Sequence, residues 1–213
     1  VPCGDALFVL GSTRPDAWML VSVLNSFVFD WMTRRRLAGT NLSFAVTSDL
    51  PLLAPGALTP LKGLIARLAF PHQKFAPMWS TLKKDRSWKN LWARTDAERL
   101  RLRVIVEAVI AFQYGLSVKE YSDILSECDY PPETLTGEFS RNLDPTGFWR
   151  FQKEKSPELR VSVLAQCAFQ QLTTSGLETF LSQNEGDGWM LPEVIRLADY
   201  DLGHDGRAKE RQP

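Results

Sequence analysis

Apolar residues with helical spacing dominate this chain, and alternating apolar and polar residues occur only near its start. The apolar stretch Ala17–Met32 follows Thr13, a good helix N-cap, and predicts one helix that continues to about Arg36. The segments Ala6–Leu10 (ALFVL) and Asn41–Val46 (NLSFAV) have the pattern of short strands. We therefore expect a small α+β N-terminal portion in a chain that is otherwise mainly α.

Two helix-start signals in the middle of the chain predict a helical hairpin. Thr95–Glu98 (TDAE) and Ser117–Glu120 (SVKE) both have the spacing of a capping box, in which a hydroxyl and a carboxylate cap each other's backbone N–H groups. Gly115 lies between them and fits the left-handed position just past a helix end. The hairpin should occupy about 95–127.

The C-terminal part of the sequence predicts a further helical unit. Ser156–Glu158 (SPE) begins a helix whose apolar positions continue to Leu172, and Gly176 interrupts it. After the loop Gly186–Gly188, the segment Pro192–Tyr200 predicts a short final helix.

Composition places the chain among globular proteins, since 44% of its 213 residues are hydrophobic and 23% are charged. The apolar stretch Ala17–Met32 is shorter than the about 20 residues that span a bilayer, and it contains Asn25 and Asp30. We therefore expect no membrane segment. The chain starts at Val1 inside an apolar stretch, without a methionine, from which we expect it to be a fragment of a longer protein.

Cysteine usage predicts a reducing, cytoplasmic environment. The cysteines are odd in number and widely spaced, so neither a disulfide framework nor a zinc site is expected. They are Cys3, Cys128 and Cys167.

Charge is distributed unevenly, although 25 basic residues balance 25 acidic ones. Residues 51–94 hold eight basic side chains and one acidic side chain, a net charge of +7, whereas residues 95–140 hold four and nine, a net charge of −5. With its three tryptophans, the basic segment has the composition of a surface that binds phosphates and stacks on bases. Packing of these cations against the acidic hairpin is an equally good interpretation, and the sequence leaves both open.

Arg34, Arg35 and Arg36 come at the predicted end of the first helix. Cations in that position stabilise the helix macrodipole by about 0.3–1 kcal/mol each, which is a sufficient structural role. The alternative role is contact with DNA phosphates.

Motifs of catalysis are absent from the sequence. It contains no glycine-rich phosphate loop, no nucleophile elbow and no His-Glu-x-x-His zinc motif. The pair His204–Asp205 near the chain end and the loop Gly186–Gly188 lack the further groups that a general base or a calcium site needs. We expect no catalytic residue and no metal site in this chain.

Three blocks of sequence near the start of the chain are Leu24–Asp30 (LNSFVFD), Arg34–Leu42 (RRRLAGTNL) and Asp49–Pro51 (DLP). Together they resemble the closing stretch of the TaqI-like specificity domain of large N6-adenine DNA methyltransferases of type IIG-like restriction–modification and related phage-defence systems. Glu98–Arg103 (ERLRLR) and Tyr114–Ser117 (YGLS) resemble the helical hairpin that follows in that family. The blocks that resemble the extension of its long members are Phe148–Arg150 (FWR), Gly188–Pro192 (GWMLP) and Gly203–Asp205 (GHD).

The resemblance implies a division of the chain and a role in DNA recognition. Residues 1–55 would end the DNA target-recognition domain, 56–130 would hold the basic irregular segment and the hairpin, and 131–213 would be a C-terminal helical extension. The family's Asn-Pro-Pro-Tyr loop and its S-adenosylmethionine-binding motif do not occur here, so catalysis and S-adenosylmethionine would belong to the parent protein. Double-stranded DNA would be the partner. The residues expected to contact it are Arg34, Arg35, Arg36, Asn41, Lys83, Lys84, Arg86 and Lys89.

A different class of function remains open. The acidic hairpin and exposed tryptophans would also suit a helical interaction module that docks a partner subunit of a defence complex. Such a module would bind its partner stably and would not bind DNA at low salt.

Overall fold

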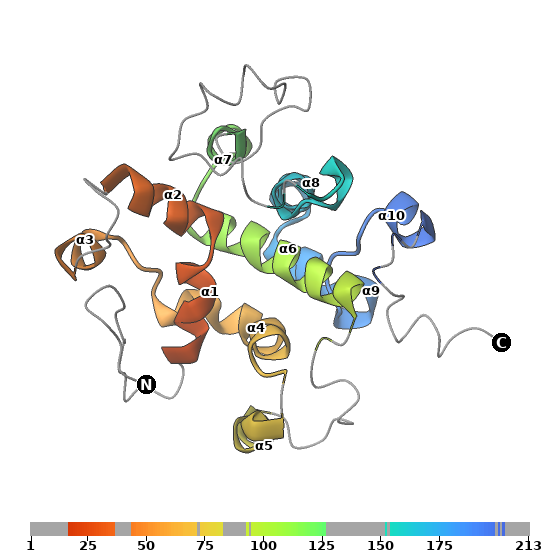
Figure 1. Cartoon of the computed structure of the whole chain (residues 1–213), viewed down its shortest axis with the longest axis horizontal. Coiled ribbons are helices and arrows are strands. Elements are labelled where there is room, and N and C mark those ends of the chain that lie inside the picture. The colour runs from red at the N-terminus through yellow and green to blue at the C-terminus, as the bar shows by residue number, and fades with distance from the viewer. Residues whose placement is uncertain are drawn as a thin grey trace.

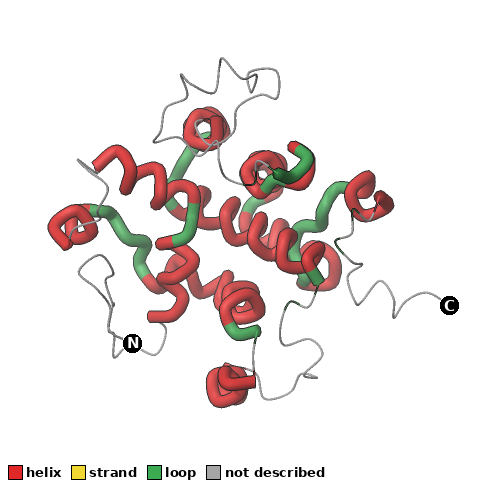
Figure 2. Tube along the Cα trace, in the orientation of Figure 1, coloured by secondary structure: helices red, strands yellow, loops and turns green. Residues whose placement is uncertain are grey.

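The computed structural model describes residues 17–36, 44–71, 73–82, 93, 95–126, 152, 154–198, 200 and 202. All of its regular elements in these ranges are helices, joined by short loops (Figure 2). The α-helices are α1 (Leu20–Leu24), α2 (Phe27–Arg36), α3 (Phe44–Asp49), α4 (Lys62–Ala69), α5 (Ala76–Leu82), α6 (Asp96–Gln113), α7 (Val118–Ser126), α8 (Val161–Ser175), α9 (Leu177–Gly186) and α10 (Glu193–Ala198). The short 3₁₀ helices are η1 (Ala17–Met19), η2 (Pro55–Leu61), η3 (Gln73–Phe75) and η7 (Pro157–Leu159).

Helix α6 runs through the middle of the molecule, with α1, α2 and α4 on one side and α8 and α9 on the other (Figure 1). Its most extensive packing is with α8. From Val104 to Ala111 every residue of α6 is buried, so this stretch is covered on all faces. A helix that is buried all round is a core helix. Helices α2, α4 and α8 pack directly against α6.

The two helices predicted for the hairpin form as α6 and α7 with a short connection, but α7 packs on α8 and α2 and not along α6. The hydroxyl of Thr95 accepts a hydrogen bond from the backbone N–H of Glu98 at 3.1 Å, and α6 begins there. Gly115 has φ of +73°, and the N–H groups of Gly115 and Leu116 donate to carbonyls in the last turn of α6. This is the glycine-ended Schellman geometry. At the start of α7 the Glu120 carboxylate accepts from the Ser117 N–H at 2.8 Å, and the Ser117 hydroxyl accepts from the Glu120 N–H at 3.2 Å.

The first predicted helix ends at Arg36 as expected, but it is broken in the middle. Asn25 and Ser26 separate α1 from α2. The Asn25 side-chain amide donates to the Val21 carbonyl at 2.7 Å, and the Ser26 hydroxyl donates to the Val23 carbonyl at 2.7 Å. Asparagine and serine side chains compete with the backbone for its own hydrogen-bonding partners, which ends a helix that the apolar pattern would have continued.

The prediction of a small α+β N-terminal portion is wrong where the structure can be compared with it. Residues 44–46, predicted as the end of a strand, belong to helix α3, and Ala6–Leu10 lies outside the described residues. A six-residue apolar pattern fits either element. The described residues include no strand that could pair with 44–46, and a helix satisfies its backbone groups internally.

The C-terminal helices form close to their predicted places, but the helix predicted to begin at Ser156–Glu158 begins at Val161, because Arg160 is extended (ψ of 136°) and separates α8 from the 3₁₀ turn η7. Gly176, with φ of +80°, separates α8 from α9, and α10 lies within the segment predicted for the final helix. Buried side chains from Met19 to Ile195 make up one hydrophobic core around α6, with a smaller cluster of Ala66, Phe70 and Trp79 beside it. No helix in the described ranges is both long enough and apolar enough to cross a bilayer.

Candidate functional site

The basic end of α2 presents three guanidinium groups. Arg34 Nε lies 3.0 Å from the Asp30 carboxylate, one helical turn back. The Arg35 guanidinium lies over the Trp31 ring, 4.3 Å from its centroid, which is a cation–π contact. The side chains of Arg35 and Arg36 are both exposed. The first three of the expected DNA-contacting residues are therefore held together on one helix end.

The other expected DNA-contacting residues lie outside the described part of the chain. They are Asn41, Lys83, Lys84, Arg86 and Lys89. One tryptophan of the basic segment is described, and it is not available for stacking on bases. Trp79 is buried, its indole Nε1 donates to the Phe70 carbonyl at 3.1 Å, and its ring meets the Phe70 ring edge-on.

One basic residue of the segment 51–94 packs against the acidic hairpin. Arg67 of α4 forms a buried ion pair with Glu98 of α6, and its guanidinium also lies 3.9 Å from the Asp187 carboxylate. The Glu98 carboxylate thus pairs with Arg67, and this ion pair joins α4 to α6. The half of the capping box that forms is the bond from the Glu98 N–H to the Thr95 hydroxyl. For Arg67 the packing interpretation of the +7 segment applies.

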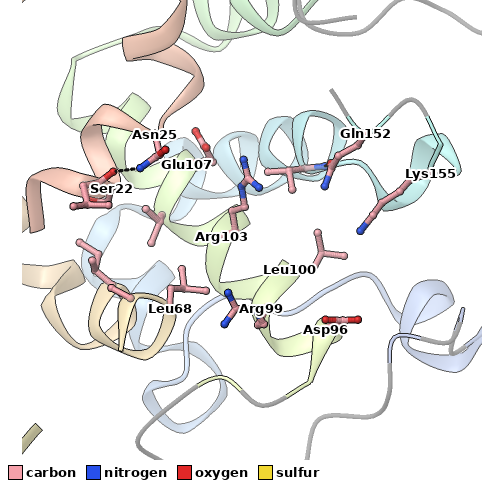
Figure 3. Close-up of a pocket in the computed structure, with 15 residues that line it drawn as sticks. Ser22, Asn25, Leu68, Asp96, Arg99, Leu100, Arg103, Glu107, Gln152 and Lys155 are labelled. Carbon is pink, nitrogen blue, oxygen red and sulfur yellow. Dashed lines mark hydrogen bonds between the residues drawn. The ribbon is translucent and has the colours of Figure 1, made fainter. Parts of the chain in front are cut away.

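A pocket of about 480 Å³ opens between α1, α4, α6 and the segment that leads into α8 (Figure 3). Apolar side chains and charged or polar side chains both line it. The apolar lining residues are Val21, Ile65, Leu68, Ala69, Leu100, Val106 and Val161. The polar ones are Ser22, Asn25, Asp96, Arg99, Arg103, Glu107, Gln152 and Lys155.

Three cations, Arg99, Arg103 and Lys155, line the pocket. Arg99 and Arg103 stand one turn apart on the same face of α6, and Lys155 reaches toward that face from the far side (Figure 3). Gln152, beside Lys155, accepts a hydrogen bond from the Val161 N–H at 2.7 Å, which ties this segment to the first turn of α8. Among the described residues, the side chains of Arg99 and Lys155 make no ion pair or hydrogen bond.

Glu107 lines the same pocket and is buried, with 3% of its surface exposed. Its carboxylate accepts a hydrogen bond from the Phe27 N–H at 3.0 Å, at the first residue of α2. Burial raises the pKa of this carboxyl to about 7, although the Phe27 N–H and the Arg103 charge act in the opposite direction. Near neutral pH, Glu107 therefore carries only part of a charge.

Sequence reasoning missed the arginines of this pocket because it summed charge over segments. Arg99, Arg101 and Arg103 all belong to the segment with net charge −5. On a helix, residues four apart share a face, and the residue between them points away. Arg101 is accordingly buried on the other side of α6, where its guanidinium donates to the Asp187 carbonyl at 2.6 Å. The sequence signal that could have revealed this pair is the Arg-x-x-x-Arg spacing of Arg99 and Arg103 within a predicted helix.

Comparison with known proteins identifies no relative. No group of histidine, cysteine, aspartate or glutamate in the described ranges could hold a metal ion. No family model, no curated protein and no solved structure matches this chain.

Proposed function

We propose that this chain is a non-catalytic helical module that holds double-stranded DNA by its phosphate backbone. In this proposal it forms the C-terminal recognition part of a cytoplasmic adenine-N6 DNA methyltransferase of the restriction–modification or phage-defence kind. Catalysis and S-adenosylmethionine belong to the rest of that protein. The observation that carries the proposal is the exposed arginine cluster at the end of α2.

The size of this charge supports phosphate binding in addition to a structural role. The C-terminus of a helix carries a partial charge of about −0.5. Arg34, Arg35 and Arg36 together with Asp30 sum to +2, which exceeds what the macrodipole needs. Consecutive helical positions differ by about 100° in direction, so the three guanidinium groups fan around the helix end. Such an arrangement positions a protein on a DNA backbone without reading its sequence.

The test is the salt dependence of duplex binding. We expect the Arg35→Ala/Arg36→Ala variant to bind a fluorescent duplex more weakly and to lose about 2 from the slope of log affinity against log salt, because each lost phosphate contact removes about 0.9. Fluorescence anisotropy over a series of salt concentrations measures both quantities. Arg34 is left unchanged because it pairs with Asp30. Without Arg34 the Asp30 carboxyl, whose pKa is already raised by burial, would lose its cationic partner.

A matched variant controls for the change in net charge. Lys119→Ala/Arg196→Ala removes two exposed cations on α7 and α10, far from α2 in the sequence, and should leave the slope within experimental error. If both double variants lower the slope equally, or if neither does, the α2 cluster is not the DNA contact.

A second pair of measurements addresses the remaining expected contacts and the competing function. Lys83→Ala/Lys84→Ala/Lys89→Ala should lower the same slope if the basic segment 83–89 also meets phosphates. The competing hypothesis, a module that docks a partner subunit, requires the unchanged chain to show no duplex binding even at low salt. It also relied on exposed tryptophans, whereas Trp79 and Trp189 are buried.

A further inference from the structure

We propose that the pocket between α1, α4, α6 and the segment 152–161 binds a small neutral molecule whose apolar body carries one N–H or O–H group, and that this group donates a hydrogen bond to the Glu107 carboxylate. Glu107 lines this pocket together with apolar side chains from α1, α4, α6 and α8. No lining residue comes from α2, whose exposed arginines carry the proposed DNA contact, so the inference does not rest on the proposed function.

The Glu107 carboxylate has a hydrogen-bonding position that the fold leaves open. An ionised carboxylate accepts hydrogen bonds at both of its oxygens. Glu107 is 3% exposed, and its Oε2 accepts from the Phe27 N–H at 3.0 Å. No other described residue donates a hydrogen bond to this carboxylate, so Oε1 keeps an acceptor position in a side chain that lines the pocket. A buried acceptor without a donor is costly, and a ligand that donates to it removes that cost.

The charges around Glu107 favour a neutral ligand. Arg103, one turn earlier on α6, acts on the Glu107 carboxylate through its charge but donates no hydrogen bond to it, and the Asp30 charge acts in the opposite direction. Arg99 and Lys155 are exposed, so water solvates their charges. Beside Glu107 an anionic ligand would meet the carboxylate and a cationic one would meet Arg103. A neutral donor meets neither repulsion.

The volume and the apolar lining set the kind of body. About 480 Å³ is within the usual range for small-molecule pockets. Ile65, Leu100 and Val106 are buried side chains that line it. Figure 3 shows Glu107 at the end of the pocket that α1 forms, away from Lys155. A body of two fused aromatic rings is small enough for this volume and gains from contact with the apolar side chains.

The test compares indole with benzofuran, which has the same shape but a ring oxygen in place of the N–H group. We expect indole to bind the full chain at least about tenfold more tightly at pH 8, as for a hydrogen bond to a charged group, in titrations followed by the NMR chemical shifts of the protein. Glu107→Gln should lower the indole affinity to that of benzofuran. Its side-chain oxygen stays with the Phe27 N–H, and its amide then presents N–H groups, which cannot accept a hydrogen bond from the ligand.

The pH dependence of binding gives a second readout. Burial is the main reason why the pKa of Glu107 rises to about 7, the Asp30 charge adds to the rise, and the Phe27 N–H and the Arg103 charge oppose it. The carboxyl is therefore mostly protonated at pH 6 and mostly ionised at pH 8. Indole affinity should rise at least about threefold over this range. The affinity for benzofuran, and both affinities of Glu107→Gln, should stay constant.

Three further variants keep the result interpretable. Glu120→Gln removes an exposed carboxylate on α7 by the same substitution and should leave indole affinity within twofold. Arg35→Ala/Arg36→Ala should do the same, which separates this site from the DNA contact. Val21→Trp fills part of the pocket at a half-exposed position and should weaken both probes about tenfold, with Glu107 intact. Equal affinity for indole and benzofuran, no binding of either, or an indole affinity that Glu107→Gln leaves unchanged would overturn the proposal.

Discussion

Glu107 connects two parts of the molecule through a single carboxyl group. It lies on the central helix, it accepts the N–H of Phe27 at the start of α2, and it lines the pocket. Burial of a carboxyl group disfavours its charged form, which is why its pKa rises to about 7. Its protonation therefore affects the stability of the folded chain.

We expect Glu107 to make the chain less stable as the pH rises from about 4.5 to about 7. Its folded pKa is raised above the unfolded value, so the stabilisation is complete below the unfolded pKa and is lost as the pH rises through the folded one. Each unit of pKa difference corresponds to about 1.4 kcal/mol. Urea denaturation of Glu107→Gln, which keeps an acceptor for the Phe27 N–H without a charge, should show a smaller loss over this range than the unchanged chain.

Glu120 provides a control of opposite sign. Hydrogen bonds from the Ser117 backbone and hydroxyl lower the pKa of this exposed carboxyl. Its stabilisation is therefore present above the unfolded pKa and is lost as the pH falls. If Glu120→Gln and Glu107→Gln alter the pH dependence in the same direction, the effect assigned to Glu107 is wrong.

At the scale of single elements, helix ends were the most predictable features. Gly115, Gly176 and the Ser117–Glu120 box act through neighbouring backbone groups, so a few residues of sequence determine them. The Thr95–Glu98 box was only half predictable, because the Glu98 carboxylate is taken by Arg67 from another helix. Local patterns indicate which groups are able to cap a helix, and tertiary packing decides which of them do.

The turn between α9 and α10 depends on a glycine for two separate reasons. Gly188 has φ of +79°, and a Cβ there would lie 3.3 Å from Ile105 Cδ1. We expect Gly188→Ala to lower the free energy of unfolding by about 1–2 kcal/mol from the left-handed backbone alone, and further through contact with the buried Ile105. Urea denaturation of the purified variant measures the sum.

Gly115→Ala separates the two contributions. Gly115 has a similar φ of +73°, but a Cβ there would meet nothing within 4 Å. This variant should therefore show the backbone cost without the packing cost. Should Gly188→Ala prove no more destabilising than Gly115→Ala, the close approach to Ile105 has no energetic weight.

At the scale of the whole molecule, the chain is joined by buried ionic contacts between its parts. Arg67 of α4 pairs with Glu98 of α6 and approaches Asp187 after α9. These groups come from the basic segment, the acidic hairpin and the C-terminal helices. Opposite charges that lie in different segments of the sequence are thus partly neutralised by direct contact within the fold.

Breaking the Arg67–Glu98 pair should be costly. We expect Glu98→Leu to lower the free energy of unfolding by about 3 kcal/mol, since it leaves a buried cation without its main partner. The double variant Arg67→Met/Glu98→Leu should be less destabilised than the sum of the two single variants, because it removes both charges. Urea denaturation of the two single variants and the double variant completes this cycle. Additive losses would mean that the two side chains do not interact.

The mainly α class and the two helices within 95–127 could be predicted from the sequence, whereas the packing of α7 on α8 and α2 and the pocket could not. The break at Asn25 and the helix at 44–49 depend on competition between local hydrogen bonds and on the absence of a pairing strand among the described residues. The pocket is lined by Arg99 of α6 and by Gln152 and Lys155 of the segment before α8, which lie far apart in the sequence. That information lies in the tertiary contacts and not in any short pattern.

The position of α6 has a consequence for how the chain folds. Its buried Glu107 and Arg101 find their hydrogen-bonding partners 80 residues earlier and 86 residues later in the chain, respectively. Helices α6 and α7 have local caps and are able to form early, but closing two long loops is slow compared with local helix formation. The Glu107 carboxyl and the Arg101 guanidinium remain hydrated until the chain around Phe27 and the chain around Asp187 pack on α6. Folding of the parts before and after α6 is therefore coupled through this helix. Removing either flank would expose the core helix and favour aggregation of the remainder.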